Sequence, residues 1–111
     1  MIKAENAKAQ MRKGVLDYCI LLILAKKEAY ASQILNYLKD AQLIVVEGTL
    51  YPLLNRLKNE GLLNYRWEES PQGPPRKFYE ITELGRTFLK HLDTAWEELV
   101  ISVNSIKKNN N

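Results

Sequence analysis

The amino-acid sequence predicts a mainly α-helical domain that carries a small β-hairpin. Three observations support this prediction: apolar residues recur at helical spacing before residue 60, two alternating segments flank a proline-rich turn, and a long apolar heptad pattern follows Thr82. The predicted order is therefore three helices, a hairpin and one long helix. That order is typical of a winged helix-turn-helix, to which a long C-terminal helix is added.

The chain has 111 residues, of which 46% are hydrophobic and 26% charged, the balance of one globular domain. We divide it at Thr82 into a winged helix-turn-helix domain (1–82) and a C-terminal helix with a disordered tail (83–111). The net charge of +3 permits a polyanionic partner without requiring one. Cys19 is the only cysteine, so no internal disulfide is expected. Residues 20–25 form an apolar run far shorter than the ~20 residues that cross a membrane, which favours a cytoplasmic protein with no membrane partner.

The first two helices are predicted from apolar stripes. In residues 7–25 a stripe begins at Met11 and widens towards Ile23, as in a helix that is buried on most sides. The segment "KKEAYA" breaks this pattern. Residues 30–41 then predict a second, shorter helix, and "QLIVVEG" reads as a loop or a short extended piece.

The third helix is predicted from four leucines, Leu50, Leu53, Leu54 and Leu57, at spacing i, i+3, i+4, i+7. Proline lacks an amide hydrogen and is tolerated in the first turn, so Pro52 places the helix start near Gly48 or Thr49. The face away from the leucines carries side chains of the kinds that bind phosphates and base edges: Thr49, Tyr51, Pro52, Asn55 and Arg56. The alternative is an ordinary solvated face. Gly61 is the predicted C-cap.

A β-hairpin is predicted because "LLNYRWEE" and "KFYEIT" alternate in polarity around "SPQGPPR", a loop of about seven residues rich in proline and glycine. We expect an exposed tip that includes Gln72, Gly73, Arg76 and Lys77. Such a wing reaches a neighbouring groove or phosphate; the alternative is a solvated turn.

The last helix is predicted from about Glu83 to Ile106, with Thr82 as its N-cap. A heptad stripe suited to a homodimer interface runs through it: Leu89, Leu92, Trp96, Leu99, Val103 and Ile106. A second stripe of Leu84, Phe88 and Ala95 is expected to face the body of the same chain. The alternative to a dimer is packing against the first helix.

The segments "MRKGVLDYCILLIL", "GTLYPLLNRLKNEGLL" and "RKFYEITELGRTFL" strongly resemble the PadR family of bacterial transcriptional regulators. The resemblance covers about residues 11–105 and points to the short subfamily with a single C-terminal dimerisation helix. It implies a homodimeric, sequence-specific repressor that binds a palindromic operator in double-stranded DNA. The predicted recognition helix carries the exposed residues of the third helix, and the wing spans residues 72–77 and meets the backbone or the minor groove.

Three further residues are expected to contact phosphates. Arg12 and Lys13 lie near the N-terminus, and Ser32 opens the second helix, where it either caps the helix or meets a phosphate. In the family this helix often begins with Tyr-Gly-Tyr, where the present chain has Tyr30-Ala31-Ser32. The resemblance also implies a candidate site for a small aromatic effector near Trp96, shared with Phe88 and Tyr18. The alternative role for Trp96 is the hydrophobic centre of the dimer interface.

Catalysis is not expected. His91 is the only histidine and has no partners for a metal site, a Ser/His/Asp set cannot be assembled, and there is no glycine-rich phosphate loop. We therefore predict no cofactor and no metal. Two other hypotheses remain: a winged-helix protein-interaction module that does not bind DNA and, more weakly, a ligand-binding or enzymatic helical dimer.

Overall fold

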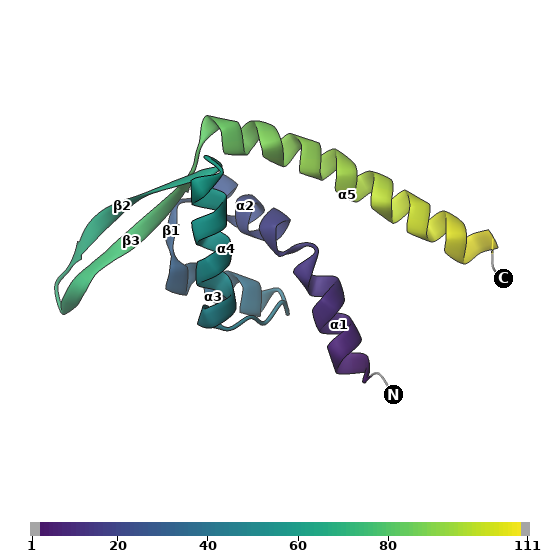
Figure 1. Ribbon diagram of the computed structural model, residues 1–111, viewed down its shortest axis with the longest axis horizontal. Helices are drawn as coiled ribbons and strands as arrows, with labels where there is room; N and C mark the ends of the chain where they lie inside the picture. The colour runs from purple at the N-terminus through teal and green to yellow at the C-terminus, as the bar shows by residue number, and fades with distance from the viewer. Residues whose placement is uncertain (1–2, 110–111) are drawn as a thin grey trace.

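The computed structural model of the chain describes residues 3–109, which form five α-helices and a three-stranded antiparallel sheet (Figure 1). The helices are α1 (Ala4–Lys13), α2 (Leu16–Lys26), α3 (Ala31–Asp40), α4 (Glu47–Asn59) and α5 (Glu83–Asn109). The strands are β1 (Ala29–Tyr30), β2 (Leu63–Ser70) and β3 (Gly73–Ile81), in the order β1-β3-β2. The predicted winged helix-turn-helix with a long C-terminal helix is confirmed; β1 has no counterpart among the predicted elements.

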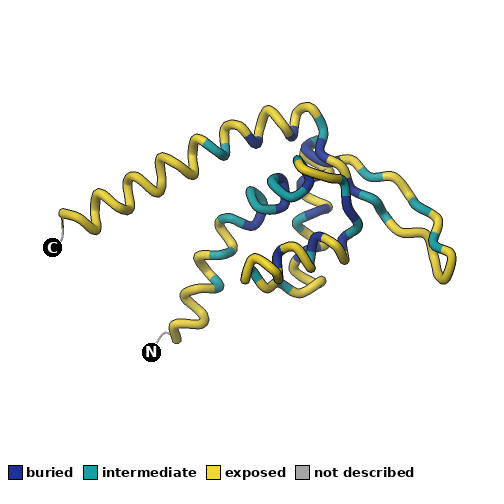
Figure 2. Tube along the Cα trace, turned by 180° about the vertical axis from the view of Figure 1, so that it is seen from behind, coloured by how far each residue is buried: buried dark blue, intermediate teal, exposed yellow. Residues whose placement is uncertain are grey.

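The hydrophobic core is built around α2, whose apolar residues face neighbours on several sides. Ile20, Leu21 and Leu24 of α2 are buried, as are Leu50 and Leu54 of α4. Figure 2 shows that buried positions gather where α2, α3, α4 and the base of the hairpin meet, whereas α1 and the outer half of α5 are exposed. The core thus fixes α3, α4 and the hairpin relative to one another.

The predicted first helix is divided in two. The amides of Gly14 and Val15 donate to carbonyls three residues back, at 3.3 and 3.0 Å, and this tighter pattern ends α1. The helix α1 then projects from the body and has no buried residue (Figure 1). Met11 is 77% exposed, so the apolar stripe predicted to begin there is buried only from α2 onward.

The hairpin turn is shorter than predicted. Ser70 pairs with Gly73, so only two residues, at 71 and 72, form the turn in place of a seven-residue loop. The register shifts by one residue between Ser70 and Glu68, where β3 carries Pro74 and Pro75. Such a bulge is one of the few places where a strand accepts proline, because the ladder is already interrupted there.

The start of α4 differs from the prediction, which placed Pro52 in the first turn of the helix. The helix begins at Glu47, so Pro52 lies in the second turn and cannot donate to the carbonyl of Gly48. Gly48 and Pro52 are both exposed, so the carbonyl of Gly48 is accessible to solvent. The helix ends at Asn59, and Gly61 has a φ of 81°, the left-handed conformation that glycine adopts after a helix.

The start of α5 is fixed by Thr82, as predicted for an N-cap. Its hydroxyl accepts a hydrogen bond from the amide of Gly85 at 2.9 Å and donates to the carbonyl of Gly61 at 2.7 Å. The helix continues to Asn109, so the tail predicted to be disordered after Ile106 is helical at residues 107–109; residues 110 and 111 lie outside the described part of the chain.

Near the start of α5 the two apolar stripes exchange their predicted roles, whereas Trp96, Leu99, Val103 and Ile106 of the heptad stripe are exposed. Leu89 is buried in the core of its own chain and Leu92 is packed against that core, so Leu89 is unavailable to a second copy. Leu84 and Phe88, predicted to face the body, are 58% and 40% exposed. The angle at which α5 leaves the sheet turns the Leu89 side towards α2.

Candidate nucleic-acid interface

The outward face of α4 is open, as the spacing of its leucines predicts. Leu50, Leu54 and Leu57 are almost completely buried on one side of the helix. The residues predicted for recognition are all exposed on the other side: Thr49, Tyr51, Pro52, Asn55 and Arg56. The face is therefore open to a partner, although the Arg56 guanidinium also contacts Asp17 of α2.

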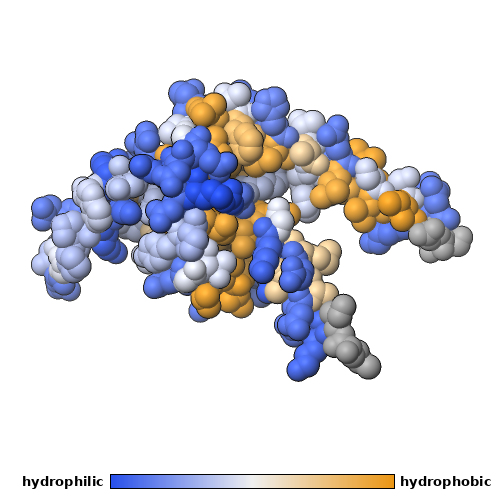
Figure 3. Space-filling view, viewed as in Figure 1, coloured by the Kyte–Doolittle hydropathy of each residue, from blue (hydrophilic) through white to orange (hydrophobic). Residues whose placement is uncertain are grey.

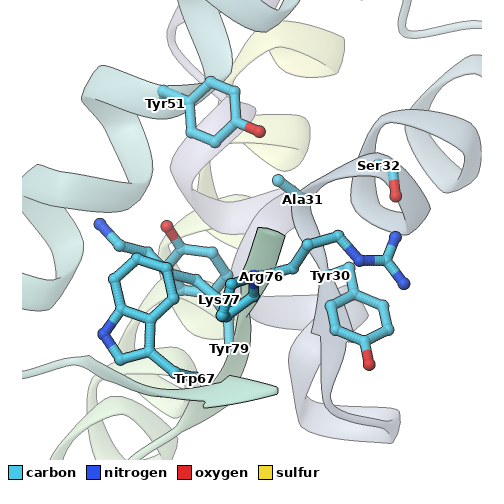
Figure 4. A pocket seen from close by; sticks show the side chains of 9 residues that line it. Tyr30, Ala31, Ser32, Tyr51, Trp67, Arg76, Lys77 and Tyr79 are labelled. Carbon is cyan, nitrogen blue, oxygen red and sulfur yellow. The ribbon is translucent and has the colours of Figure 1, made fainter. Parts of the chain in front are cut away.

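A hollow of about 350 Å³ lies where the start of α3, the leading end of α4 and the hairpin meet (Figure 4). It brings together four residues predicted to contact DNA, Ser32, Tyr51, Arg76 and Lys77. Five more residues line it: Tyr30, Ala31, Trp67, Pro75 and Tyr79. Its wall therefore combines aromatic rings with two cations, a composition suited to an anionic group.

The two cations of the hollow are held over aromatic rings. The guanidinium carbon of Arg76 lies 4.0 Å from the centre of the Tyr30 ring. The amine of Lys77 lies 4.5 Å from the Tyr65 ring and 5.6 Å from the Trp67 ring. Such contacts orient a cation without neutralising it. Within residues 3–109 no carboxylate forms an ion pair with Arg76 or Lys77, so both keep a free positive charge.

Arg76 and Lys77 belong to β3 and not to the tip of the hairpin, which corrects the predicted loop. The other residues predicted in the wing and near the N-terminus lie away from the hollow. Gln72 and Gly73 are the residues at the tip. Arg12 and Lys13 end α1, which lies on the opposite side of α4 from the hairpin (Figure 1).

Arg56 is exposed, but its charge is compensated within the chain. Its guanidinium donates to Asp17 of α2 at 2.5 Å and to Glu60 at 3.1 Å. The hydrogen bond with Asp17 is the main cause that raises the pKa of Arg56. The second carboxylate oxygen of Asp17 is buried and has no hydrogen-bond partner among the described residues. Arg56 thus ties α4 to α2.

The residues that the sequence did not single out are mainly aromatic. Trp67 and Tyr79 follow the alternation of the core-facing side of the hairpin, which is the signal that places them towards α4. Trp67 is nevertheless 61% exposed, because the hairpin extends beyond the core. Tyr79 is buried, and burial raises the pKa of its hydroxyl.

The three residues predicted for an effector site do not line one cavity in a single chain. The rings of Tyr18 and Trp96 lie 6.3 Å apart. The Tyr18 hydroxyl donates to Asp93 at 2.5 Å, and this bond is the main cause that raises the pKa of Tyr18 to about 12. A shallow hollow beside Trp96 is lined by Glu97, Val100 and Ile101, without Tyr18 or Phe88.

The outer half of α5 presents an exposed apolar row. It includes four of the residues predicted for a dimer interface, Trp96, Leu99, Val103 and Ile106, which are 42–61% exposed. Figure 3 shows hydrophobic side chains along this part of the helix and a hydrophilic surface over the wing. An apolar surface of this kind on a small domain typically marks a protein interface.

Comparison with known proteins decides the family. A model of the transcriptional regulator PadR-like family matches residues 20–91, which is more than half of the chain. The chain belongs to this family. A solved PadR-like transcription factor from Bacteroides fragilis is 61% identical, with a TM-score of 0.78, and the match covers 91% of this chain and 98% of that one. A PadR-like transcriptional regulator from Bacillus cereus is 37% identical, with a TM-score of 0.75 and coverage of 87% and 95%. An uncharacterized protein from Lysinibacillus sphaericus is 30% identical over 90 residues, which are 78% of this chain and 83% of that one.

Membership of the PadR-like family makes the chain a transcriptional regulator and not an enzyme. The predicted resemblance to this family is confirmed. Within residues 3–109 no three His, Cys, Asp or Glu side chains gather as they would around a metal ion. The same residues contain no helix that has both the length and the apolar character needed to span a membrane.

Proposed function

We propose that this PadR-like regulator is a sequence-specific DNA-binding repressor that acts as a homodimer in the cytoplasm on a palindromic operator. One observation carries the proposal: the exposed face of α4 and the two uncompensated cations of the hollow form a single open surface. A duplex carries a regular row of phosphates, so a surface with this charge beside a projecting helix suits it.

In this proposal, α4 contacts the bases, whereas the hairpin, the start of α3 and the end of α1 contact the DNA backbone. Thr49, Tyr51, Pro52 and Asn55 enter the major groove from α4, with Arg56 at the rim because it also binds Asp17. Backbone contacts come from a second group, which fixes the protein on the duplex without reading its sequence: Ser32, Arg76, Lys77, Arg12 and Lys13. The tip, with Gln72 and Gly73, reaches along the backbone or into the minor groove.

The homodimer is proposed to form through the exposed row on α5. Trp96, Leu99, Val103 and Ile106 lie at heptad spacing, and Leu92 borders the row where it joins the core. A second copy related by a two-fold axis would cover the same row and present two α4 helices to one duplex. Because a palindrome has the same symmetry, the two half-sites would be read identically.

A small aromatic effector is proposed to bind between the two copies of α5. The observation that favours this site is the tilted pair of Tyr18 and Trp96, beside a shallow hollow at the edge of the dimer row. An aromatic ligand would add a third ring there. Quenching of tryptophan fluorescence that disappears in Trp96→Leu would support the site, whereas unchanged quenching in that variant would remove it.

The DNA-binding proposal is tested by fluorescence anisotropy with a duplex selected from random fragments by the protein. The logarithm of the affinity should fall linearly with the logarithm of the salt concentration, with a slope of about −0.9 for each phosphate contacted. Asn55→Ala should weaken binding to the selected duplex, whereas Asn59→Ala, at the far end of α4, is the matched control. A protein-interaction module would ignore both the duplex and a competing polyanion such as heparin, and that result would refute the proposal.

A further inference from the structure

A continuous row of four side chains, with the two central rings tilted by 59°, crosses the outer face of the sheet. The guanidinium of Arg66 lies 4.6 Å from the Phe78 ring, that ring lies 4.8 Å from the Tyr30 ring, and the guanidinium of Arg76 lies 4.0 Å from the Tyr30 ring. Register explains the row, because Arg66 and Tyr30 both pair with Phe78 from opposite sides of β3. Each of the two neighbouring rings therefore has an arginine over it.

The two ends of the row differ in their charge environment. Arg66 is surrounded by three carboxylates: Glu68 at 3.0 Å, Glu28 at 3.3 Å and Glu80 at 4.0 Å. Arg76 has no ion pair with any carboxylate of residues 3–109. Arg66 is therefore paired with acidic side chains, whereas within residues 3–109 Arg76 is not.

Arg76 has an acidic cross-strand partner in β2 with which it forms no ion pair. Glu68 is the residue directly opposite Arg76 in the β2–β3 pairing, where opposite charges normally attract each other. The Glu68 carboxylate instead turns back along its own strand and accepts a hydrogen bond from Arg66. Arg76 leans the other way, over Tyr30, and its guanidinium lies on the side of the hollow where Ser32 also points (Figure 4).

Tyr30 is itself held in place at the start of α3. Its amide donates to the side chain of Gln33 at 2.9 Å, and its backbone pairs with Phe78 in the sheet. The ring beneath Arg76 is consequently fixed to both the helix and the sheet. A guanidinium stacked on a fixed ring has fewer conformations to lose when it binds an anion.

We propose that Arg66 is a positioning residue: by holding Glu68, it leaves Arg76, stacked on Tyr30, free to bind a DNA backbone phosphate beside Ser32. The inference rests on the proposed function. Arg66 does not touch the duplex in this arrangement, although it is basic and lies on the wing. Its loss would release Glu68 to pair with Arg76 and so remove a phosphate contact from each protomer.

The experiment is a rescue measured by anisotropy on the selected duplex. Arg66→Gln should lower the affinity about two- to five-fold for each protomer bound, the range of an exposed charge pair, and should make the salt slope shallower. Adding Glu68→Gln to Arg66→Gln should restore both the affinity and the slope. Lys90→Gln, an exposed position on α5, removes the same charge far from the wing and should change neither. Thermal denaturation of each variant shows that the fold is retained.

Each result decides between distinct explanations. If Arg66→Gln weakens binding and Glu68→Gln does not restore it, Arg66 contacts DNA directly and the inference is wrong. An unchanged affinity in Arg66→Gln also overturns it. A further loss when Arg66→Gln is added to Arg76→Gln would show that Arg66 acts independently of Arg76. If the wild-type protein shows no salt-dependent binding while it remains folded, the proposed function itself fails, and the inference fails with it.

Discussion

Gly85 provides the sharpest test of how α5 is joined to the winged domain. It is buried in the first turn of α5, against the base of the hairpin. A Cβ atom at this position would overlap the carbonyl oxygen of Leu62 and would lie 2.7 Å from the Ile81 side chain. The backbone cannot easily withdraw, because Gly85 and Leu62 both hydrogen-bond to Thr82, at 2.9 and 3.1 Å.

The expected cost of Gly85→Ala follows from this overlap. Overpacking a close backbone contact destabilises a protein by about 1–3 kcal/mol, and here the obstruction includes a carbonyl group that cannot rotate away. For a domain of this size each kcal/mol lowers the melting temperature by roughly 4–8 °C. We therefore expect a decrease of about 5–20 °C.

The assay is circular dichroism during thermal and urea denaturation, at one protein concentration for all variants because dimerisation adds to stability. Gly48→Ala is the matched control, since a Cβ there meets nothing within 4 Å and the position lies in α4. That control should be neutral or more stable by up to ~1 kcal/mol. A Gly85→Ala protein as stable as wild type would refute the close packing of α5 on the hairpin.

Three other predictions concern single side chains. Tyr18→Phe removes the hydrogen bond to Asp93. Folding raises the pKa of Tyr18 from 10.0 to about 12, so the stability that this bond contributes is full below about pH 10 and is lost as the pH rises to about 12. In urea denaturation across that range, the free energy of unfolding should decline more steeply for wild type than for the variant, and parallel declines would contradict this prediction. Arg56→Ala should lower DNA affinity by anisotropy and, as a half-exposed ion pair, cost only about 0.2–1 kcal/mol in urea denaturation; unchanged affinity would remove Arg56 from the contacts. Leu99→Asp should shift the mass in sedimentation from dimer to monomer, whereas Lys90→Asp should not, and a dimeric Leu99→Asp protein would place the interface elsewhere.

The sequence could predict those features that depend on neighbours along the chain. The spacing of Leu50, Leu54 and Leu57 places one face of α4 inward, and that face is buried. Thr82 and Gly61 are recognised by their residue types at helix ends, and both have the expected geometry. These features need no knowledge of where the rest of the chain lies.

Other features depend on how distant segments meet, which periodicity does not encode. In α5, Phe88 and Leu89 are adjacent, and their side chains point about 100° apart around the helix. The sequence pattern is equally compatible with a core-facing stripe that contains Phe88 and with one that contains Leu89. Leu89 is the buried one because the contact of Gly85 with Leu62 fixes the direction in which α5 leaves the sheet. The heptad pattern alone therefore could not tell the core stripe from the exposed one.

The same limit applies to charge. Arg56, Arg66 and Arg76 are equivalent cations in the sequence, and all three lie on elements that a winged helix presents to DNA. Asp17, which is 39 residues from Arg56, and Glu28, which is 38 residues from Arg66, come from segments before α3 and compensate the first two. Arg76 has no such ion pair within residues 3–109, and Glu68, its partner in the ladder, is bonded to Arg66. The affinity of this surface for a polyanion then depends on which carboxylates the fold brings to each arginine, so net charge is a poor guide to it and the location of the acidic residues is a better one.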